Sequence, residues 1–173
     1  MGLEETRRWL AGAACAALVA GVAWHHGMRP VVLKTGDHLQ ALPVSSLSGE
    51  RVDARTNGQA QIINIFASWC PPCRAEAPRI VALAKTAQTL GIAVIGVDQQ
   101  EPASAVRSFA SAFDIPYPLY VDRTNITHDR LGARVIPTTI LVDASGVIRW
   151  ERSGPLTDAD MQSLRGTLAM VHT

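Results

Sequence analysis

The chain has 173 residues and a formal net charge of +1, and 47% of its residues are hydrophobic against 18% that are charged. Such a composition supplies enough apolar material for a packed core and excludes a generally disordered chain, and the length suits one domain with a short additional segment. The small net charge and the lack of long basic or acidic runs argue against nucleic acid as a partner.

The first 28 residues are expected to form an export signal or a membrane anchor. Arg7 and Arg8 precede a stretch from Trp9 to Met28 that contains no Asp, Glu, Lys or Arg. A basic segment followed by an apolar one is the pattern of a secretory signal, and the stretch just reaches the ~20 residues that a spanning helix needs. We expect an apolar helix that is retained as an anchor, and cleavage after Ala23 is the alternative. Cys15 lies inside it, as an apolar helix residue or, alternatively, a lipidated one.

Residues 29–40 are expected to be a linker, and residues 41–173 to form the folded domain. Hydrophobic periodicity, together with Gly, Pro and Ser as turn and cap residues, predicts its elements in chain order. They are an N-terminal hairpin of 42–47 with 51–54, a buried strand 61–66, a helix 71–90, a strand 92–97, a helix 102–113, an extended piece 118–121, a short helix 126–131, a hairpin of 138–142 with 147–150, and a last helix that Thr157 caps.

This order predicts the α/β class, with a central mixed sheet flanked by helices. The early strand–helix–strand unit predicts parallel pairing, and the late hairpin adds antiparallel strands. The carboxyl end of the 61–66 strand, where sites of α/β proteins tend to lie, leads directly into Trp69-Cys70-Pro71-Pro72-Cys73.

Cys70 and Cys73 are predicted to be a redox-active pair, since three cysteines are too few for a disulfide scaffold. Cys70 directly precedes the first helical turn, where the positive end of the helix dipole favours a thiolate. Pro71 and Pro72 lack N–H groups, so they stiffen the turn and remove two donors to the Cys70 sulfur. We expect Cys70, at the exposed end, to attack and Cys73 to resolve the mixed disulfide.

Two other interpretations of the pair remain open at this point. A zinc site would need a second cysteine pair or histidines at ligand spacing, and none of the five histidines has that spacing to the pair, so no metal is expected. A purely structural disulfide would close only a very short loop, which stabilises a fold less than a long one does.

The motifs around the pair resemble the thioredoxin superfamily, and more closely its exported or membrane-tethered TlpA/ResA/CcmG-type members. The similarity covers roughly residues 40–170. It rests on the run from Asn64 to Pro78, on Ile136-Pro137-Thr138-Thr139, on Asp143-Ala144-Ser145-Gly146 and on Gly154-Pro155-Leu156-Thr157. It implies a thioredoxin fold with no cofactor.

The resemblance also implies roles for single residues. Pro137 should follow a cis peptide bond and face the cysteines, and its loop should hold the substrate backbone beside Cys70. The other expected substrate-binding residues are Trp69, Pro71, Pro72 and Ile136. Pro78 should kink the helix. Glu76, one turn beyond Cys73, should tune the cysteines and accept a proton, the alternative being a solvated side chain. This sequence departs from the family at Asn64, where cytoplasmic thioredoxins carry a buried aspartate, and at Thr138, where CcmG-like members carry glutamate.

The resemblance further implies a monomeric reductant on the periplasmic side of the inner membrane, kept reduced by a membrane donor of the DsbD/CcdA type. Its substrates would be disulfides of exported proteins, with apocytochrome c as one candidate. A disulfide oxidant or isomerase, and a metal- or haem-delivery chaperone that uses the same thiols, are the alternatives. A peroxidase would need a threonine where Ala67 stands.

Overall fold

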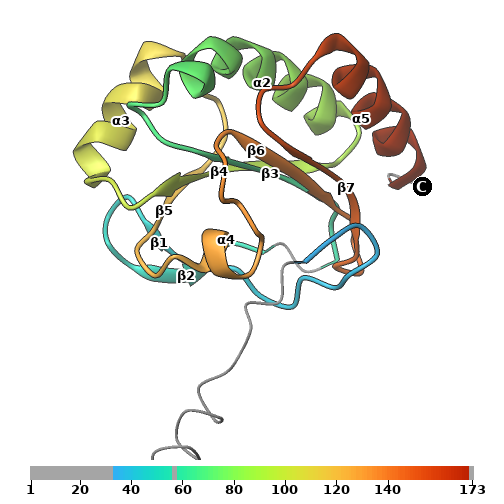
Figure 1. Ribbon diagram of the computed structural model, residues 1–173, viewed down its shortest axis with the longest axis horizontal. Coiled ribbons are helices and arrows are strands. Elements are labelled where there is room, and N and C mark those ends of the chain that lie inside the picture. Colours follow the sequence, from blue (N-terminus) through green and yellow to red (C-terminus); the bar gives the residue numbers. More distant parts are fainter. Residues whose placement is uncertain (1–32, 56–57, 172–173) are drawn as a thin grey trace, which may run out of the picture. The chain divides into compact units, whose positions relative to one another are not determined.

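The computed structural model describes residues 33–55 and 58–171, and the elements expected beyond residue 42 are present with ends shifted by a few residues. In chain order they are β1 (Pro43–Ser46), β2 (Arg51–Asp53), β3 (Gln61–Phe66), α2 (Pro71–Thr89), β4 (Ala93–Gln99), α3 (Ala103–Ala112), β5 (Leu119–Asp122), α4 (Ile126–Asp129), β6 (Thr138–Val142), β7 (Ile148–Ser153) and α5 (Asp158–Val171) (Figure 1).

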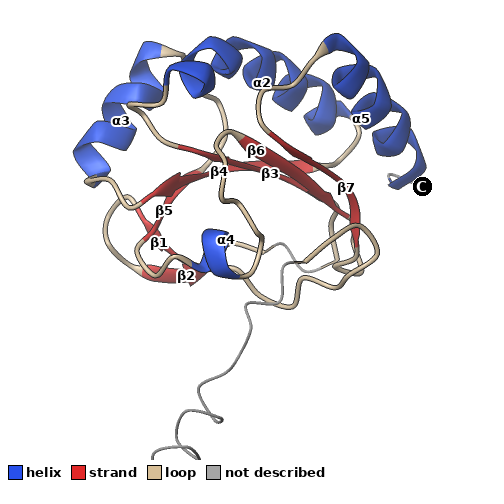
Figure 2. Cartoon of the chain, in the orientation of Figure 1, coloured by secondary structure: helices blue, strands red, loops and turns tan. Residues whose placement is uncertain are grey.

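All strands belong to one mixed sheet in the order β2-β1-β5-β4-β3-β6-β7 (Figure 2). The central strands β3, β4 and β5 run parallel, because α2 and α3 connect them as crossovers. The predicted hairpins β1–β2 and β6–β7 pair antiparallel, and β6 is also antiparallel to β3. The expected mixed sheet is therefore confirmed.

Helices α2, α3 and α5 cover one face of the sheet, and α4 lies on the other (Figure 1). All six residues of β3 are buried, because both faces are covered. Alternating side chains point to opposite faces, so Ile62 and Phe66 pack under the helices while Ile63 and Ile65 join the core on the α4 side. Packing on both faces fixes the position of β3, and the turn 67–70 that carries Cys70 begins at its carboxyl end.

The segment 33–40, expected to be part of a linker, packs against the domain. The Gly36 N–H donates to the Ile148 carbonyl and the Leu39 N–H to the Gly146 carbonyl, both at 2.8 Å. Leu39 is only 1% exposed. Backbone pairing with the β6–β7 hairpin and burial of one leucine therefore extend the folded unit N-terminally to at least Leu33.

The predicted N-terminal helix, its cleavage site and Cys15 lie outside the described residues. Within 33–55 and 58–171, no helix combines the length and the apolar character required to cross a bilayer.

Substitutions at two glycines, one in β4 and one in α5, test the packing of the sheet face under α3. A Cβ atom on Gly96 would lie 3.0 Å from Phe66 Cε1 and still closer to Leu119 Cδ2, whereas on Gly166, in α5, it would meet nothing within 4 Å. We expect Gly96→Ala to lower the free energy of unfolding by about 1–3 kcal/mol through overpacking. Gly166→Ala should raise it by up to ~1 kcal/mol through helix propensity. Urea unfolding measures both, and equal effects would contradict this account.

Candidate active site

Cys70 and Cys73 form a disulfide at the carboxyl end of β3, with their Cα atoms 5.3 Å apart. Cys70 is the N-cap residue of α2, and Pro71 and Pro72 occupy the first two helical positions. Ala67 accepts a hydrogen bond from the Cys70 N–H at 3.2 Å, which closes the turn between strand and helix. The sequence thus places the pair at the start of the helix, as predicted.

The sulfur of Cys70 accepts a hydrogen bond from the Cys73 N–H at 3.3 Å. The N-terminal N–H groups of a helix lack intrahelical partners, and here two of them are replaced by proline nitrogens. The Cys73 N–H is therefore the first helical donor available to the sulfur. When Cys70 is a thiolate, this donor and the helix dipole stabilise its charge.

The expectation that Cys70 lies at an exposed end is wrong for the disulfide form, since Cys70 and Cys73 are each 3% exposed. The Ile136 carbonyl oxygen lies 3.9 Å from the Cys70 sulfur, and both cysteines belong to a cluster with Phe66 and Phe109. Trp69, directly before Cys70, is 67% exposed instead. Packing of the 135–137 loop against the pair, which local sequence does not encode, covers the sulfurs.

The Ile136–Pro137 peptide bond is cis, as predicted. Ile136 is half-buried and packs against the cysteine cluster, while Pro137 is buried. The Pro137 carbonyl accepts a hydrogen bond from the Gly154 N–H at 2.8 Å. The segment 154–156 therefore holds the loop that contacts Cys70.

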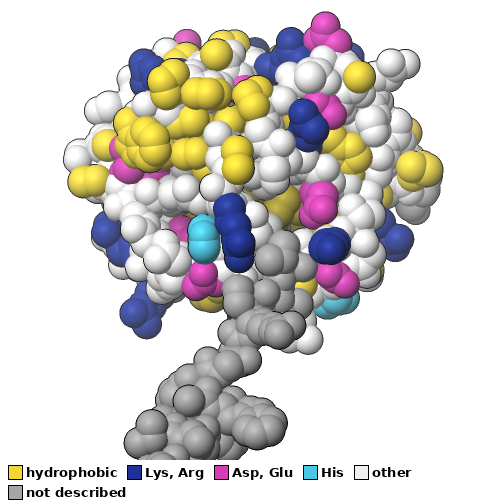
Figure 3. Space-filling model, in the orientation of Figure 1, with side chains coloured by type: hydrophobic (Ala, Val, Ile, Leu, Met, Phe, Trp, Pro, Cys, Tyr) yellow, Lys and Arg dark blue, Asp and Glu magenta, His cyan; other side chains and the backbone are white. Residues whose placement is uncertain are grey.

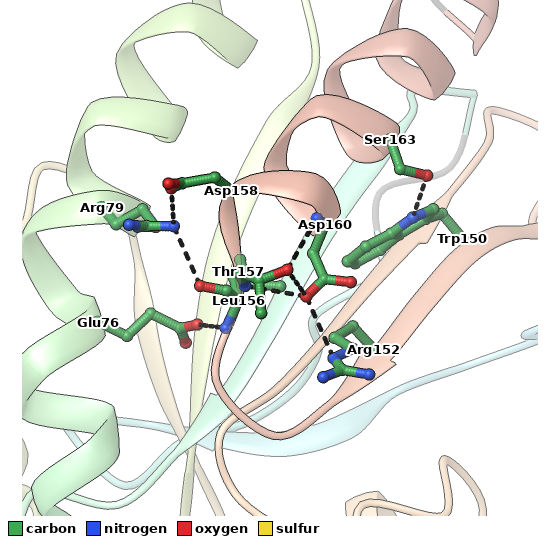
Figure 4. Close-up of polar contacts among 9 residues, drawn as sticks. All are labelled: Glu76, Arg79, Trp150, Arg152, Leu156, Thr157, Asp158, Asp160 and Ser163. Carbon is green, nitrogen blue, oxygen red and sulfur yellow. Dashed lines mark hydrogen bonds and ion pairs between the residues drawn. The ribbon is translucent and has the colours of Figure 1, made fainter.

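Glu76 is 6% exposed, so it is not the solvated side chain of the alternative interpretation. Its Oε1 accepts a hydrogen bond from the Leu156 N–H at 2.6 Å (Figure 4). Burial raises the pKa of Glu76, although the Leu156 N–H, Arg79 and the side-chain amide of Asn64 act in the opposite direction. Asn64 also donates to Thr139 Oγ1 at 3.1 Å. Asn64 stands where cytoplasmic thioredoxins carry an aspartate, and its side-chain amide lowers the pKa of the buried Glu76 carboxyl group.

A polar network near the surface also holds the segment 154–156 and the start of α5 (Figure 4). Arg79 Nη1 donates to the Leu156 carbonyl at 3.1 Å and pairs with Asp158 at 2.9 Å. Thr157 and Asp160 cap α5 reciprocally, each accepting a hydrogen bond from the other's N–H. Sequence analysis predicted the Thr157 cap but missed Arg79, because its partners lie far along the chain.

The remaining predicted residues lie as follows. Pro71 and Pro72 are exposed on the first turn of α2, and Pro78 lies inside α2, which continues to Thr89. Its predicted kink stays a prediction. Across residues 33–55 and 58–171, no three His, Cys, Asp or Glu side chains are grouped so that they could hold a metal ion.

Comparisons with known proteins agree with this geometry. The sequence model of the AhpC/TSA family matches residues 35–151. The chain is 29% identical over 163 residues to the thioredoxin-like protein YneN of Bacillus subtilis, covering 90% of this chain and 95% of YneN. It is 28% identical over 126 residues to the thiol–disulfide oxidoreductase ResA of Halalkalibacterium halodurans, covering 72% of each.

Among solved structures, the chain is similar to a thiol:disulfide interchange protein of the thioredoxin family from Chlorobium tepidum TLS. The TM-score is 0.66 at 26% identity, and the match covers 81% of this chain and 99% of that chain. The predicted thioredoxin fold is confirmed.

Burial of Glu76 makes a prediction about stability and pH. The pKa of Glu76 is higher in the folded chain than the ordinary 4.5, so protonation of Glu76 stabilises the folded state. That contribution is complete below the unfolded pKa and is lost as pH rises through the folded pKa. Glu76→Gln cannot ionise, so it should lose less stability than the wild type as the pH rises above the ordinary 4.5.

Urea unfolding at several pH values measures this difference, with Glu50→Gln, in the exposed β1–β2 turn, as the matched control. The control should run parallel to the wild type. A parallel curve for Glu76→Gln as well would show that Glu76 titrates as it does in the unfolded chain.

Proposed function

The chain belongs to the AhpC/TSA family and is a thiol–disulfide oxidoreductase, and we propose that it reduces disulfide bonds of exported proteins outside the cytoplasm. The observation that carries this proposal is the Cys70–Cys73 pair at the N-terminus of α2, beside the cis-Pro137 loop. A pair held this way can accept and release two electrons without a cofactor.

In the proposed reaction, the Cys70 thiolate attacks one sulfur of the substrate disulfide and forms a mixed disulfide, and the other substrate sulfur leaves as a thiolate. Cys73 then loses its proton and attacks the Cys70 sulfur, which releases the second substrate thiolate. Two electrons pass to the substrate, and the two leaving thiolates take up protons. The chain is left with the Cys70–Cys73 disulfide that the structure contains.

The hydrogen bond from the Cys73 N–H to the Cys70 sulfur supports Cys70 as the attacking residue. This donor acts on the first step, in which Cys70 must be a thiolate, because the leaving group of the resolving step is the substrate thiolate. Cys70 is covered in the oxidised form, so we propose that the 135–137 loop, with the carbonyl of Ile136, gives way to the substrate backbone.

The surface around the pair supports a protein substrate. Trp69 and Val135 are exposed by 67% and 56%. Hydrophobic side chains gather on the surface over α3 and the adjoining N-terminal end of α2 (Figure 3). Exposed apolar surface next to a reactive group is typical of a docking site. We propose that the substrate chain docks there, with Trp69, Pro71, Pro72, Ile136 and Pro137 as its contacts.

Glu76 is proposed to accept the proton of Cys73. Both residues lie on the buried side of α2, one turn apart. A carboxyl group whose pKa is raised by burial takes up a proton more readily than an exposed one. The acceptor would therefore be within the protein, where water has little access.

The setting of the reaction is also proposed. The composition of residues 1–28 supports export, with retention as a periplasmic anchor or cleavage as the two outcomes. A membrane dithiol donor of the DsbD/CcdA type would reduce the pair again after each turnover. An apocytochrome c haem-binding pair is the substrate that we propose first.

Insulin reduction together with a measured redox potential tests the direction of electron flow. The wild type, given dithiothreitol, should accelerate insulin reduction, and Cys70→Ser should abolish this because the attacking sulfur is gone. The potential should lie nearer to the about −270 mV of thioredoxin than to the about −120 mV of DsbA. A potential near the oxidising value without reductase activity would overturn the proposed direction.

Trapping with Cys73→Ala identifies the partner. Without the resolving sulfur, the mixed disulfide on Cys70 should persist in extracts of the exported fraction and be released by dithiothreitol. The double variant Cys70→Ser/Cys73→Ala is the control and should trap nothing. If the single variant traps no species either, Cys70 is not the attacking residue.

Glu76→Gln tests the proton acceptor. We expect the thiol pKa values to shift and insulin reduction to slow by about 10²-fold or more, the usual contribution of general base catalysis. Glu50→Gln serves as the matched control and should leave both unchanged. Unaltered thiol pKa values and rates in Glu76→Gln would assign Glu76 a structural role only.

A further inference from the structure

A second buried carboxyl group lies beside the cysteine turn and has no place in the reaction described so far. Asp98, near the end of β4, is 0% exposed and pairs in register with Phe66, the last residue of β3. Paired residues of neighbouring strands point to the same face, so Asp98 lies on the face covered by α2 and α3. The turn that leads to Cys70 leaves the sheet next to it.

Asp98 and Glu101 are in contact. The Glu101 N–H donates to Asp98 Oδ1 at 2.9 Å, whereas Asp98 Oδ2 is buried and accepts no hydrogen bond from any described donor. The two carboxyl groups lie close enough to interact electrostatically. Two carboxylates both ionised in this contact would repel each other, and a hydrogen bond between them requires a proton.

The environment decides which group holds the proton. Burial, together with the hydrogen bond to Glu101, raises the pKa of Asp98 to about 8. The hydrogen bonds from Asp98 and Ser68 outweigh the opposing effect of burial and lower the pKa of Glu101. These directions make Asp98 the group suited to donate, and Glu101 the carboxylate suited to accept, at neutral pH.

Glu101 in turn holds the turn before Cys70. It accepts hydrogen bonds from both the N–H and the hydroxyl of Ser68, the latter at 2.7 Å. On the other side of this residue, Arg74 Nη1 donates to the Ser68 carbonyl at 3.2 Å. Ser68 directly precedes Trp69, so Glu101 fixes the path of the chain into the active turn.

We propose that Asp98 and Glu101 share one proton and act as positioning residues that hold, through Ser68, the turn carrying Trp69 and Cys70. Glu76 is a single carboxyl group that is proposed to accept a proton during the reaction. The proton shared by Asp98 and Glu101 instead holds the turn in place. The inference rests on the proposed function only in taking Cys70 as the working cysteine.

The charged surroundings of the pair are sparse. From α2, Arg74 donates to the Ser68 carbonyl and lies over the ring of Phe113. From β5, the carboxylate of Asp122 accepts hydrogen bonds from Thr124 and Thr127. Phe66 of β3, which pairs with Asp98, is apolar, as are the buried residues of α3. The α3 cation Arg107 donates to the Leu47 carbonyl. No described cation forms an ion pair with Asp98 or Glu101. Ionisation of Asp98 therefore brings uncompensated repulsion and weakens the hold on Ser68.

Carboxyl-detected NMR of the oxidised protein tests this directly. The Asp98 side-chain signal should titrate near pH 8, and the Ser68 amide proton should shift with the same midpoint. Hydrogen-exchange protection of the Ser68 amide should fall by about tenfold across that step, as expected when a charge-assisted hydrogen bond is lost. An Asp98 titration at the ordinary value of about 4 would overturn the proposal.

Substitutions separate a shared proton from simple packing. Asp98→Asn keeps a donor toward Glu101 but cannot ionise, so it should preserve the Ser68 amide shift and abolish its pH dependence. Asp98→Ala should lose the shift at every pH, and the exposed Asp114→Asn control should keep the wild-type step. A wild-type step that survives in Asp98→Asn would refute the role of Asp98.

The oxidised protein transfers no electrons in these measurements, so they remain decisive even if insulin reduction fails. Insulin reduction then supplies the functional readout. The pH profile of the wild type should show an inflection near pH 8 that Asp98→Asn lacks, while the two rates agree at pH 7. Identical profiles with an intact NMR step would remove the link between the pair and the active turn.

Discussion

The hydrogen bond from the Cys73 N–H to the sulfur of Cys70 is the contact on which the chemistry of the site depends. It exists because β3, buried on both faces, ends at Phe66 and α2 begins five residues later, at Pro71. Two prolines then remove the competing donors of the first turn. The sheet thus positions the sulfur, and the helix supplies the dipole and the single N–H that favour its charged form.

A second set of contacts joins the cysteine helix to the cis-proline loop. Glu76 binds the N–H of Leu156, and the nearby Gly154 N–H binds the carbonyl of Pro137. One short segment therefore connects a buried carboxyl group to the loop that covers Cys70. Arg79 also binds this segment, through the carbonyl of Leu156, so the segment keeps a second contact with α2 when the protonation of Glu76 changes.

Buried carboxyl groups are costly unless they are hydrogen-bonded or protonated, and the site contains both solutions. Glu76 accepts a hydrogen bond from a backbone N–H, whereas burial raises the pKa of Asp98, the group that we propose to share a proton with Glu101. The position where thioredoxins carry an aspartate holds Asn64, a neutral partner for Thr139. The buried carboxyl groups near the cysteines lie instead on α2, at Glu76, and near the end of β4, at Asp98.

The sequence by itself determined what depends on neighbours along the chain. Alternation and turn residues predicted the strands and helices beyond residue 42, the Thr157 cap and the cysteine pair at a helix start. The cis bond before Pro137 followed from family motifs. Tertiary structure decided the burial of Cys70, the partner of Glu76 some 80 residues away, the packing of 33–40 and the Asp98–Glu101 contact. These depend on which surfaces the sheet brings together, and the side-chain environment of a carboxyl or thiol group is set by that packing rather than by local sequence.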